Sequence, residues 1–227
     1  MVRYSKVIGP RMYIRPIREV DTEALRDAMS DWRADGVQMT DDQAALTIKE
    51  WVGQMQRNHQ NFFEASADPN NQDAFVVDPA NVFERTWCYD GFYLNDTDEC
   101  IGFQIGKFVG KKYEHRAVML RPSFRGQGYY SESSGLGAKT LFLQIKNCTG
   151  MTATLPVEPS AAMKGHLDKS IWVSDDLEIK NYTSVERIDP VTYSKQEITK
   201  EQWLEWYNAD EQADFRSERY EYKILEE

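Results

Sequence analysis

Two glycines and an arginine stand close together in the segment from Leu120 to Gly128, which reads LRPSFRGQG. An apolar stretch ends at Leu120, and helical spacing begins at Tyr129. Glycines let the backbone bend tightly and approach a ligand closely, because no Cβ intervenes. The first N–H groups of a helix lack internal partners and carry the positive end of its dipole, so they attract phosphate. Arg125 adds a permanent positive charge, and the pattern is typical of an anion-binding turn.

Other glycine-rich phosphate sites fit this segment less well. The sequence contains no GxxxxGK[ST] motif, which excludes a Walker-type loop. A Rossmann fingerprint is disfavoured because the preceding strands are predicted to form a meander rather than βαβ units. An ordinary strand-turn-helix with two turn glycines stays open on the pattern alone.

The elements that must position the turn are predicted from hydrophobic periodicity. The capping box Thr40-Asp41-Asp42-Gln43 predicts the start of a long helix, and a second box, Thr199-Lys200-Glu201-Gln202, predicts another near the end. Three β-rich runs joined by short turns predict an antiparallel meander. The predicted strands are 12–17, 86–94, 100–109, 113–120, 151–157, 171–173, 177–179, 182–185 and 219–225, the last of them an edge strand. The predicted helices begin near residues 22, 40, 129, 160 and 200.

The segment from Pro122 to Gly128 resembles the acetyl-CoA motif of the GNAT superfamily, in which Arg/Gln-x-x-Gly-x-Gly/Ala follows a strand ending in hydrophobic-x-Pro. The order of predicted elements from Met12 to Tyr182 is similar to that family as well. The resemblance implies an α+β (α/β) fold with a mixed, mostly antiparallel central sheet flanked by helices. It places a GNAT-like domain at residues 1–185 and a C-terminal extension at 186–227.

The resemblance also implies a cofactor site. A V-shaped gap is expected between two parallel strands, at 118–120 and 152–154, where backbone groups of Met119 and Leu120 would pair with pantetheine. The amides of the turn would hold the pyrophosphate of acetyl-CoA; they belong to Arg125, Gly126, Gln127, Gly128, Tyr129 and Tyr130. Tyr130 stands where the family has Gly or Ala. Two further departures lie in the later motif, where Pro159 replaces Asn and His166 replaces Tyr.

Two residues are candidates for the chemistry of acetyl transfer, which needs a free amine and a proton for the departing thiolate. By resemblance, a carboxylate near the start of the strand before the turn takes the proton of the amine, and Glu114 lies there beside His115. Alternation along a strand directs only one of these two side chains to the cleft. His166 could protonate the thiolate, since imidazole titrates near neutrality. Each could equally be an ordinary surface residue.

Composition excludes several classes of function. The net charge is −10, which disfavours sequence-independent nucleic-acid binding and mildly favours a cationic substrate. No apolar run is long enough to cross a bilayer, and no secretory signal is visible, so a cytoplasmic protein is expected. Cys88, Cys100 and Cys148 lack CxxC spacing and predict free buried thiols rather than a disulfide or a metal site.

The leading hypothesis is therefore an N-acetyltransferase that moves an acetyl group from acetyl-CoA to a primary amine of a small molecule or protein. The alternative is a GNAT-like fold without catalysis that serves as a binding or structural component of a larger assembly, such as a virus particle. A third option is an aminoacyl or other acyl transferase on the same fold. The sequence leaves the acceptor open, and also whether the chain forms a homo-oligomer.

Overall fold

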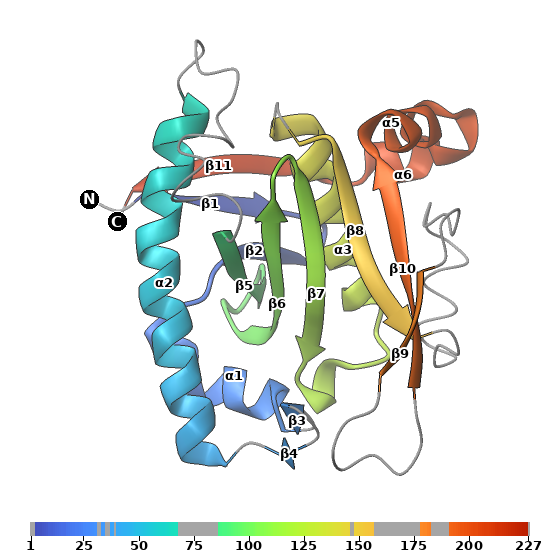
Figure 1. Cartoon of the computed structure of the whole chain (residues 1–227). Coiled ribbons are helices and arrows are strands. Elements are labelled where there is room, and N and C mark those ends of the chain that lie inside the picture. The colour runs from blue at the N-terminus through green and yellow to red at the C-terminus, as the bar shows by residue number, and fades with distance from the viewer. Residues whose placement is uncertain are drawn as a thin grey trace.

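The computed structural model describes residues 3–30, 33–34, 37–38, 40–67, 86–145, 148–156, 178–182 and 191–226. Within these residues, nine strands form one mixed sheet in the order β11-β1-β2-β5-β6-β7-β8-β10-β9 (Figure 1). Every pairing is antiparallel except that of β7 with β8. The mixed, mostly antiparallel sheet expected from the sequence is confirmed.

The bounds of the elements follow the chain. The strands of the sheet are β1 (Arg3–Ile8), β2 (Met12–Pro16), β5 (Thr86–Leu94), β6 (Cys100–Val109), β7 (Lys112–Leu120), β8 (Gly150–Pro156), β9 (Glu178–Tyr182), β10 (Val191–Thr199) and β11 (Glu221–Glu226), and β3 (Arg33–Ala34) and β4 (Val37–Gln38) form a small hairpin. The helices are α1 (Thr22–Ala28), α2 (Asp41–Ala67), α3 (Tyr129–Lys139), α5 (Lys200–Asn208) and α6 (Ala213–Ser217). Short helical turns are η1 (Glu19–Asp21), η3 (Pro122–Phe124), η4 (Thr140–Gln144) and η5 (Asp210–Gln212).

The meander β5-β6-β7 forms the centre of the sheet, with the bounds predicted from its β-rich runs except that β7 begins one residue earlier, at Lys112. From β7 the chain passes through the glycine turn into α3 and returns in β8, which pairs with β7 in parallel. A parallel neighbour requires such a crossover, because a short hairpin can join only antiparallel strands. The glycine turn therefore lies at the C-terminal end of β7.

One face of the sheet is covered by α1 and α2. Apolar residues recur in α2 at i, i+4, i+7, i+8 and i+11, and they are Ala44, Ile48, Trp51, Val52 and Met55. This spacing gives the helix one apolar stripe, which packs on Tyr89, Tyr93 and Phe103 of the meander. The predicted capping box begins the helix, since Thr40 N–H donates to Gln43 Oε1 at 2.9 Å and Gln43 N–H to Thr40 Oγ1 at 3.3 Å.

The opposite face is covered by α3, η4, α5 and α6, and Figure 1 shows α3 behind β7 and β8. The capping box at Thr199 and Gln202 begins α5 as predicted. Trp203 of α5 is 1% exposed and packs against Phe142 of η4 at 5.1 Å between ring centroids. Gly135 lets α3 approach α6, because a Cβ there would lie 2.9 Å from Cε2 of Phe215.

The C-terminal segment contributes two strands to the same sheet. β10 lies between β8 and β9, and β11 pairs with β1 along its whole length, so the two chain ends lie side by side (Figure 1). The edge strand predicted near residues 219–225 is confirmed as β11. The sequence patterns did not predict β1 or β10, both of which mix polar and apolar residues without a clear period.

Several predicted segments lie outside the described residues, namely the strand at 171–173 and the helix from residue 160, with His166 on it. β9 (Glu178–Tyr182) covers most of the strand predicted at 177–179, whereas residues 183–185 of the strand predicted at 182–185 lie outside the described residues. The three cysteines are free thiols, and burial raises the pKa of Cys100 to about 12 and that of Cys148 to about 11.

In the described part of the chain, no helix combines the length and the hydropathy needed to span a membrane.

Candidate active site

The glycine turn has the backbone that its sequence predicts. Gly126 and Gly128 adopt φ values of +72° and +84°, and Gly128 is the N-cap of α3. L-residues rarely adopt such angles, so glycine is required at both positions. A Cβ on Gly126 would meet no atom within 4 Å, which leaves open space beside the turn. The N-terminus of α3 faces this end of β7 with the N–H donors that a phosphate requires.

Arg11, in the turn between β1 and β2, supplies a cation to the glycine turn. Its Nη1 donates to the carbonyl of Gln127 at 2.9 Å, and its guanidinium stacks over the ring of Tyr129 at 4.4 Å. Its Nε forms an ion pair of 2.8 Å with Glu132 in the first turn of α3. The Arg11 side chain is 47% exposed, whereas Glu132 is 8% exposed. Arg11 therefore neutralises a buried carboxylate that would otherwise repel an anion at this helix end.

The side chains of Arg125 and Gln127 brace the turn. Arg125 Nε donates to the carbonyl of Leu120 at 2.9 Å, and Gln127 Nε2 donates to the carbonyl of Ser123 at 2.7 Å. Arg125 thus joins the turn to the last residue of β7. One nitrogen of the Arg125 guanidinium, Nε, is therefore used in a hydrogen bond with the backbone.

The backbone of β7 alternates between its two edges. Arg121 N–H donates to Ile101 O on the β6 side at 2.9 Å. Alternation then directs the backbone groups of Met119 to β6 and those of Val118 and Leu120 to the edge that faces β8. Consistent with this, the Met119 carbonyl lies 2.2 Å from the position of a Cβ on Gly102 of β6. The geometry favours Val118 and Leu120 over Met119 as partners of an extended ligand.

The strands β7 and β8 diverge at a fork. Their pairing runs from Lys112 with Gly150 to His115 with Ala153 and stops there. On the other side of β7, the register with β6 shifts by one residue at Arg116, which marks a β-bulge. The gap predicted from the sequence lies between these two strands, but it begins after Ala153, so Thr152 and Ala153 are still paired with β7. Bulges bend a strand and re-aim its groups, and they are frequent beside active sites.

Glu114 lies one residue before the fork. Its carboxylate contacts Arg116 Nη2 at 2.5 Å and Lys107 Nζ at 3.3 Å, and the side chain is 20% exposed. His115 points to the opposite face of the sheet, toward α3. The predicted alternation is confirmed, and Glu114 stands at the predicted end of β7 with two cations bound to it.

Tyr129 and Tyr130 leave the turn in different environments. Tyr129 lies under Arg11 and meets the ring of Phe124 edge-on at 6.1 Å. Tyr130 lines a cavity between α3 and the sheet, and burial raises the pKa of its hydroxyl. Its bulk therefore points beneath the helix.

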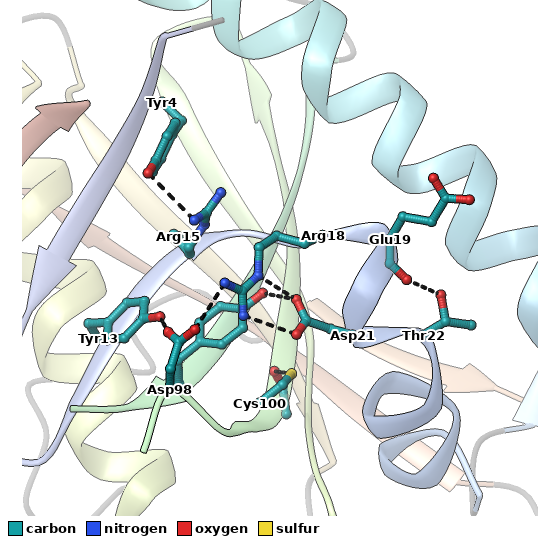
Figure 2. A network of polar contacts seen from close by, with 11 residues as sticks. Tyr4, Tyr13, Arg15, Arg18, Glu19, Asp21, Thr22, Asp98 and Cys100 are labelled. Carbon is teal, nitrogen blue, oxygen red and sulfur yellow. Dashed lines mark hydrogen bonds and ion pairs between the residues drawn. The ribbon is translucent and has the colours of Figure 1, made fainter. Parts of the chain in front are cut away.

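Two polar networks, centred on Arg18 and Arg121, connect α1 to the sheet. Arg18 binds both carboxylate oxygens of Asp21, at 2.8 and 3.0 Å, and reaches Asp98 at 3.2 Å, while Tyr93 donates to Asp21 at 2.9 Å (Figure 2). This network ties the start of α1 to the β5–β6 turn. Next to the glycine turn, Arg121 makes ion pairs of 2.8 Å with Asp27 of α1 and 2.6 Å with Glu99. The end of β7 is thereby fixed against α1 and β6.

Sequence patterns did not identify Arg11, Val118 or Glu132. Arg11 precedes Gln127 by 116 positions and belongs to no motif, so only the pairing of β1 with β2 brings it to the turn. Val118 depends on strand register, which the sequence does not encode locally. Glu132 carries a weak signal, because acidic residues favour the first turn of a helix.

Comparisons with known proteins give a consistent result at the level of structure. No protein-family model and no curated protein sequence matches the chain. A GNAT-family acetyltransferase from Bacillus anthracis has a similar structure, with a TM-score of 0.62 and 15% identity over 86% of this chain and 99% of that one. Mutant forms of a spermidine/spermine N-acetyltransferase from Vibrio cholerae reach 0.56 at 9% identity over 87% and 98%. A putative ribosomal-protein-serine acetyltransferase from the same organism reaches 0.55 at 11% over 86% and 97%. The chain therefore has the GNAT fold that these acetyltransferases share.

Proposed function

We propose that the protein is an acetyl-CoA-dependent N-acetyltransferase. The observation that carries the proposal is the alignment of three features along one strand: the glycine turn after β7, the unpaired edge of β7, and the fork with its bulge. The fold it shares with acetyltransferases supports acetyl transfer as the general reaction.

The residues present fit acetyl-CoA in shape and charge. The amides from Gly126 to Tyr130 and the guanidiniums of Arg11 and Arg125 suit a pyrophosphate. From Leu120 back to Arg116 the open edge of β7 is about 13 Å long, which suits an extended pantetheine arm bound by Val118 and Leu120. Bound in this way, acetyl-CoA supplies an activated acetyl group at the fork.

The fork provides the groups that the transfer requires. Backbone N–H groups at the bulge suit the thioester carbonyl, whose oxygen gains negative charge as the amine attacks. Glu114 lies next to the fork and is the proposed acceptor of the proton of the amine, directly or through water. His166 remains the proposed proton donor to the thiolate. The acceptor is proposed to be a primary amine, and the spermidine/spermine acetyltransferase among the structural neighbours supports that class.

A second candidate, a GNAT-like binding protein without catalysis, is favoured by one observation. Glu114 already forms ion pairs with Lys107 and Arg116, so its carboxylate is engaged by two side chains of the protein itself. In this case the protein would serve as a binding or structural component of a larger assembly, without turnover of acetyl-CoA.

Titration calorimetry with acetyl-CoA tests the proposal. We expect binding, and we expect Arg11→Ala to weaken it by roughly tenfold, since hydrogen bonds to charged groups contribute about 1.5–3 kcal/mol. Lys112→Ala is the matched control. Lys112 has the same 47% exposure and also pairs with a carboxylate, Glu197, but it lies at the opposite end of β7.

Equal losses in the two variants would show that Arg11 acts only through overall charge. No binding at high-micromolar acetyl-CoA would overturn the enzyme hypothesis. Binding without acetylation of any amine in a broad panel, which includes polyamines and peptides, would instead support the second candidate.

A further inference from the structure

A polar cavity lies between α3 and the sheet, and Met55 of α2 also contributes to its lining. Its volume is about 110 Å³, and its lining extends from β11, β1 and β2 across the meander to β8. The polar side chains that line its middle are Cys88, Asp90, Gln104, Tyr113, Ser133 and Ser134. Helix α3 contributes Gly137 where a larger residue would narrow the space. A cavity of this size holds several waters or one molecule of about five heavy atoms.

Asp90 is the charged group at the centre of the cavity floor. It lies opposite Gln104 across the β5–β6 pair and accepts a hydrogen bond of 3.3 Å from Gln104 Nε2. Among the described residues, this is the one polar contact of the carboxylate, and it has no ion pair. Burial raises the pKa of Asp90 to about 6, so the group is mostly ionised at neutral pH. Asp90 is half-buried, and a carboxylate that loses contact with water without gaining a cation is destabilised, a cost that a cationic ligand removes.

Tyr113 adds a buried hydroxyl to the cavity. Its side chain is 6% exposed, and its hydroxyl is buried without a hydrogen bond in the described structure. The hydroxyl lies against the backbone of Gly106, where a Cβ would be 1.9 Å away. Cys88 and Asp90 line the same cavity as Tyr113, and burial raises the pKa of the Tyr113 hydroxyl. A neutral hydroxyl here can accept a hydrogen bond from a ligand.

The remaining walls fix the size and the charge of a ligand. Phe108, Ala138, Leu141 and Met151 form an apolar side that suits a short hydrocarbon chain. The other titratable side chains along the cavity are Arg15, Cys88, Tyr113, His115, Tyr130 and Tyr222. None of them forms an ion pair with Asp90 within the described structure, so the negative charge of Asp90 is not balanced from the cavity wall.

We propose that this cavity binds a small primary ammonium compound, with the Asp90 carboxylate as its counter-ion, Tyr113 as a hydrogen-bond acceptor and an apolar chain against η4. Asp90 lies away from the proposed acetyl-transfer site, although the same cavity is also lined by Tyr130, which follows the glycine turn, and by His115 and Ala153, the last pair before the fork. β5 lies two strands from β7, so the ammonium at Asp90 is about 10 Å from the fork. The inference therefore stands whether or not the glycine turn binds acetyl-CoA.

The test uses the full chain without acetyl-CoA and two ligands of equal size, n-butylamine and 1-butanol, titrated to millimolar concentration and followed by protein NMR. At about pH 7.5 we expect butylamine to shift the resonances of α3 and β5 and to bind more tightly than butanol. Binding of butylamine should weaken at about pH 5, because protonation of Asp90 removes the counter-ion while the amine stays charged.

Asp90→Asn keeps the shape and removes the charge. It should weaken butylamine binding by roughly tenfold or more and leave butanol binding unchanged. Asp96→Asn, in the exposed β5–β6 turn, is the matched control and should change neither. Equal affinity for amine and alcohol would overturn the proposal. Butylamine binding that persists in Asp90→Asn would also overturn the proposal. The absence of any binding would overturn it as well and would indicate that the cavity holds only ordered water.

Discussion

Two acidic side chains, the buried Asp21 and the half-buried Asp90, differ in how their negative charge is balanced. Asp21, 8% exposed, has both oxygens bound to Arg18 and accepts a further hydrogen bond from Tyr93 (Figure 2). Asp90 has a single neutral partner, Gln104. The first arrangement offsets the cost of desolvation, and the second does not. An unbalanced carboxylate lowers stability, so its presence is better explained by a ligand than by folding.

At the residue scale, Asp90→Asn should stabilise the protein above pH 6. The folded-state pKa of about 6 exceeds the ordinary value of 3.8, so the folded state holds its proton more tightly, and wild-type stability falls as pH rises between these values. About two pKa units correspond to about 3 kcal/mol, and Asn carries no such loss. Urea denaturation of both proteins from about pH 4 to 7.5 measures the difference. A constant difference at every pH would show that Asp90 does not titrate as described.

At the element scale, α3 contains two glycines whose surroundings differ. Gly135 faces α6, and Gly137 faces the cavity with no atom within 4 Å of a Cβ. Helix propensity disfavours both glycines equally, by about 1 kcal/mol relative to alanine. Tertiary contact, not propensity, therefore distinguishes the two positions. The same helix also carries the glycine turn at its start, so its position affects the proposed cofactor site.

Replacing each glycine of α3 by alanine separates these effects. Gly137→Ala should raise the free energy of unfolding by about 1 kcal/mol, because it removes backbone freedom from the unfolded chain and meets no neighbour. Gly135→Ala should gain nothing or lose stability, since its methyl group would have to displace Phe215 from 2.9 Å. Thermal and urea unfolding measure both changes. An equal gain in the two variants would mean that α6 does not pack on α3 as described.

At the scale of the whole molecule, the last strand of the chain, β11, forms one edge of the sheet. β11 pairs with β1 over six residue pairs and brings Tyr220 and Tyr222 onto the core beneath α3. Without it, the free edge of β1 would present unpaired backbone groups to other chains. The charged residues Glu221 and Lys223 lie on β11, and Arg219 lies just before it; such charges discourage edge-to-edge association.

A chain that ends at Ser217 tests this role. We expect a lower melting temperature, because the core loses two partly buried tyrosines, and increased self-association through the exposed edge of β1. Calorimetry and light scattering give the two readouts. Lys223→Ala in the full chain is the control, since it changes charge and keeps the strand. A monomeric truncated chain with unchanged melting temperature would show that β11 is dispensable.

Local patterns in the sequence determined much of this fold. The capping boxes at Thr40 and Thr199, the meander and the strand-glycine-helix transition depend on residues close together in the chain, so their signals are read directly. The motif from Pro122 to Gly128 also indicated the GNAT fold, which the structural comparisons confirm. The boundary near residue 185 stays a prediction, as do the roles of Glu114 and His166.

Tertiary structure alone decided which distant residues meet. Arg11 reaches the glycine turn because β1 and β2 place it there, and Val118 faces the open edge because of the register with β6. The polar cavity around Asp90 exists because α3 packs over the sheet with a glycine, Gly137, in the cavity lining. Such contacts depend on strand register and helix packing, which are set by the whole core and leave no local pattern. The glycine turn was readable from the sequence for the opposite reason, since its backbone angles require glycine at two nearby positions.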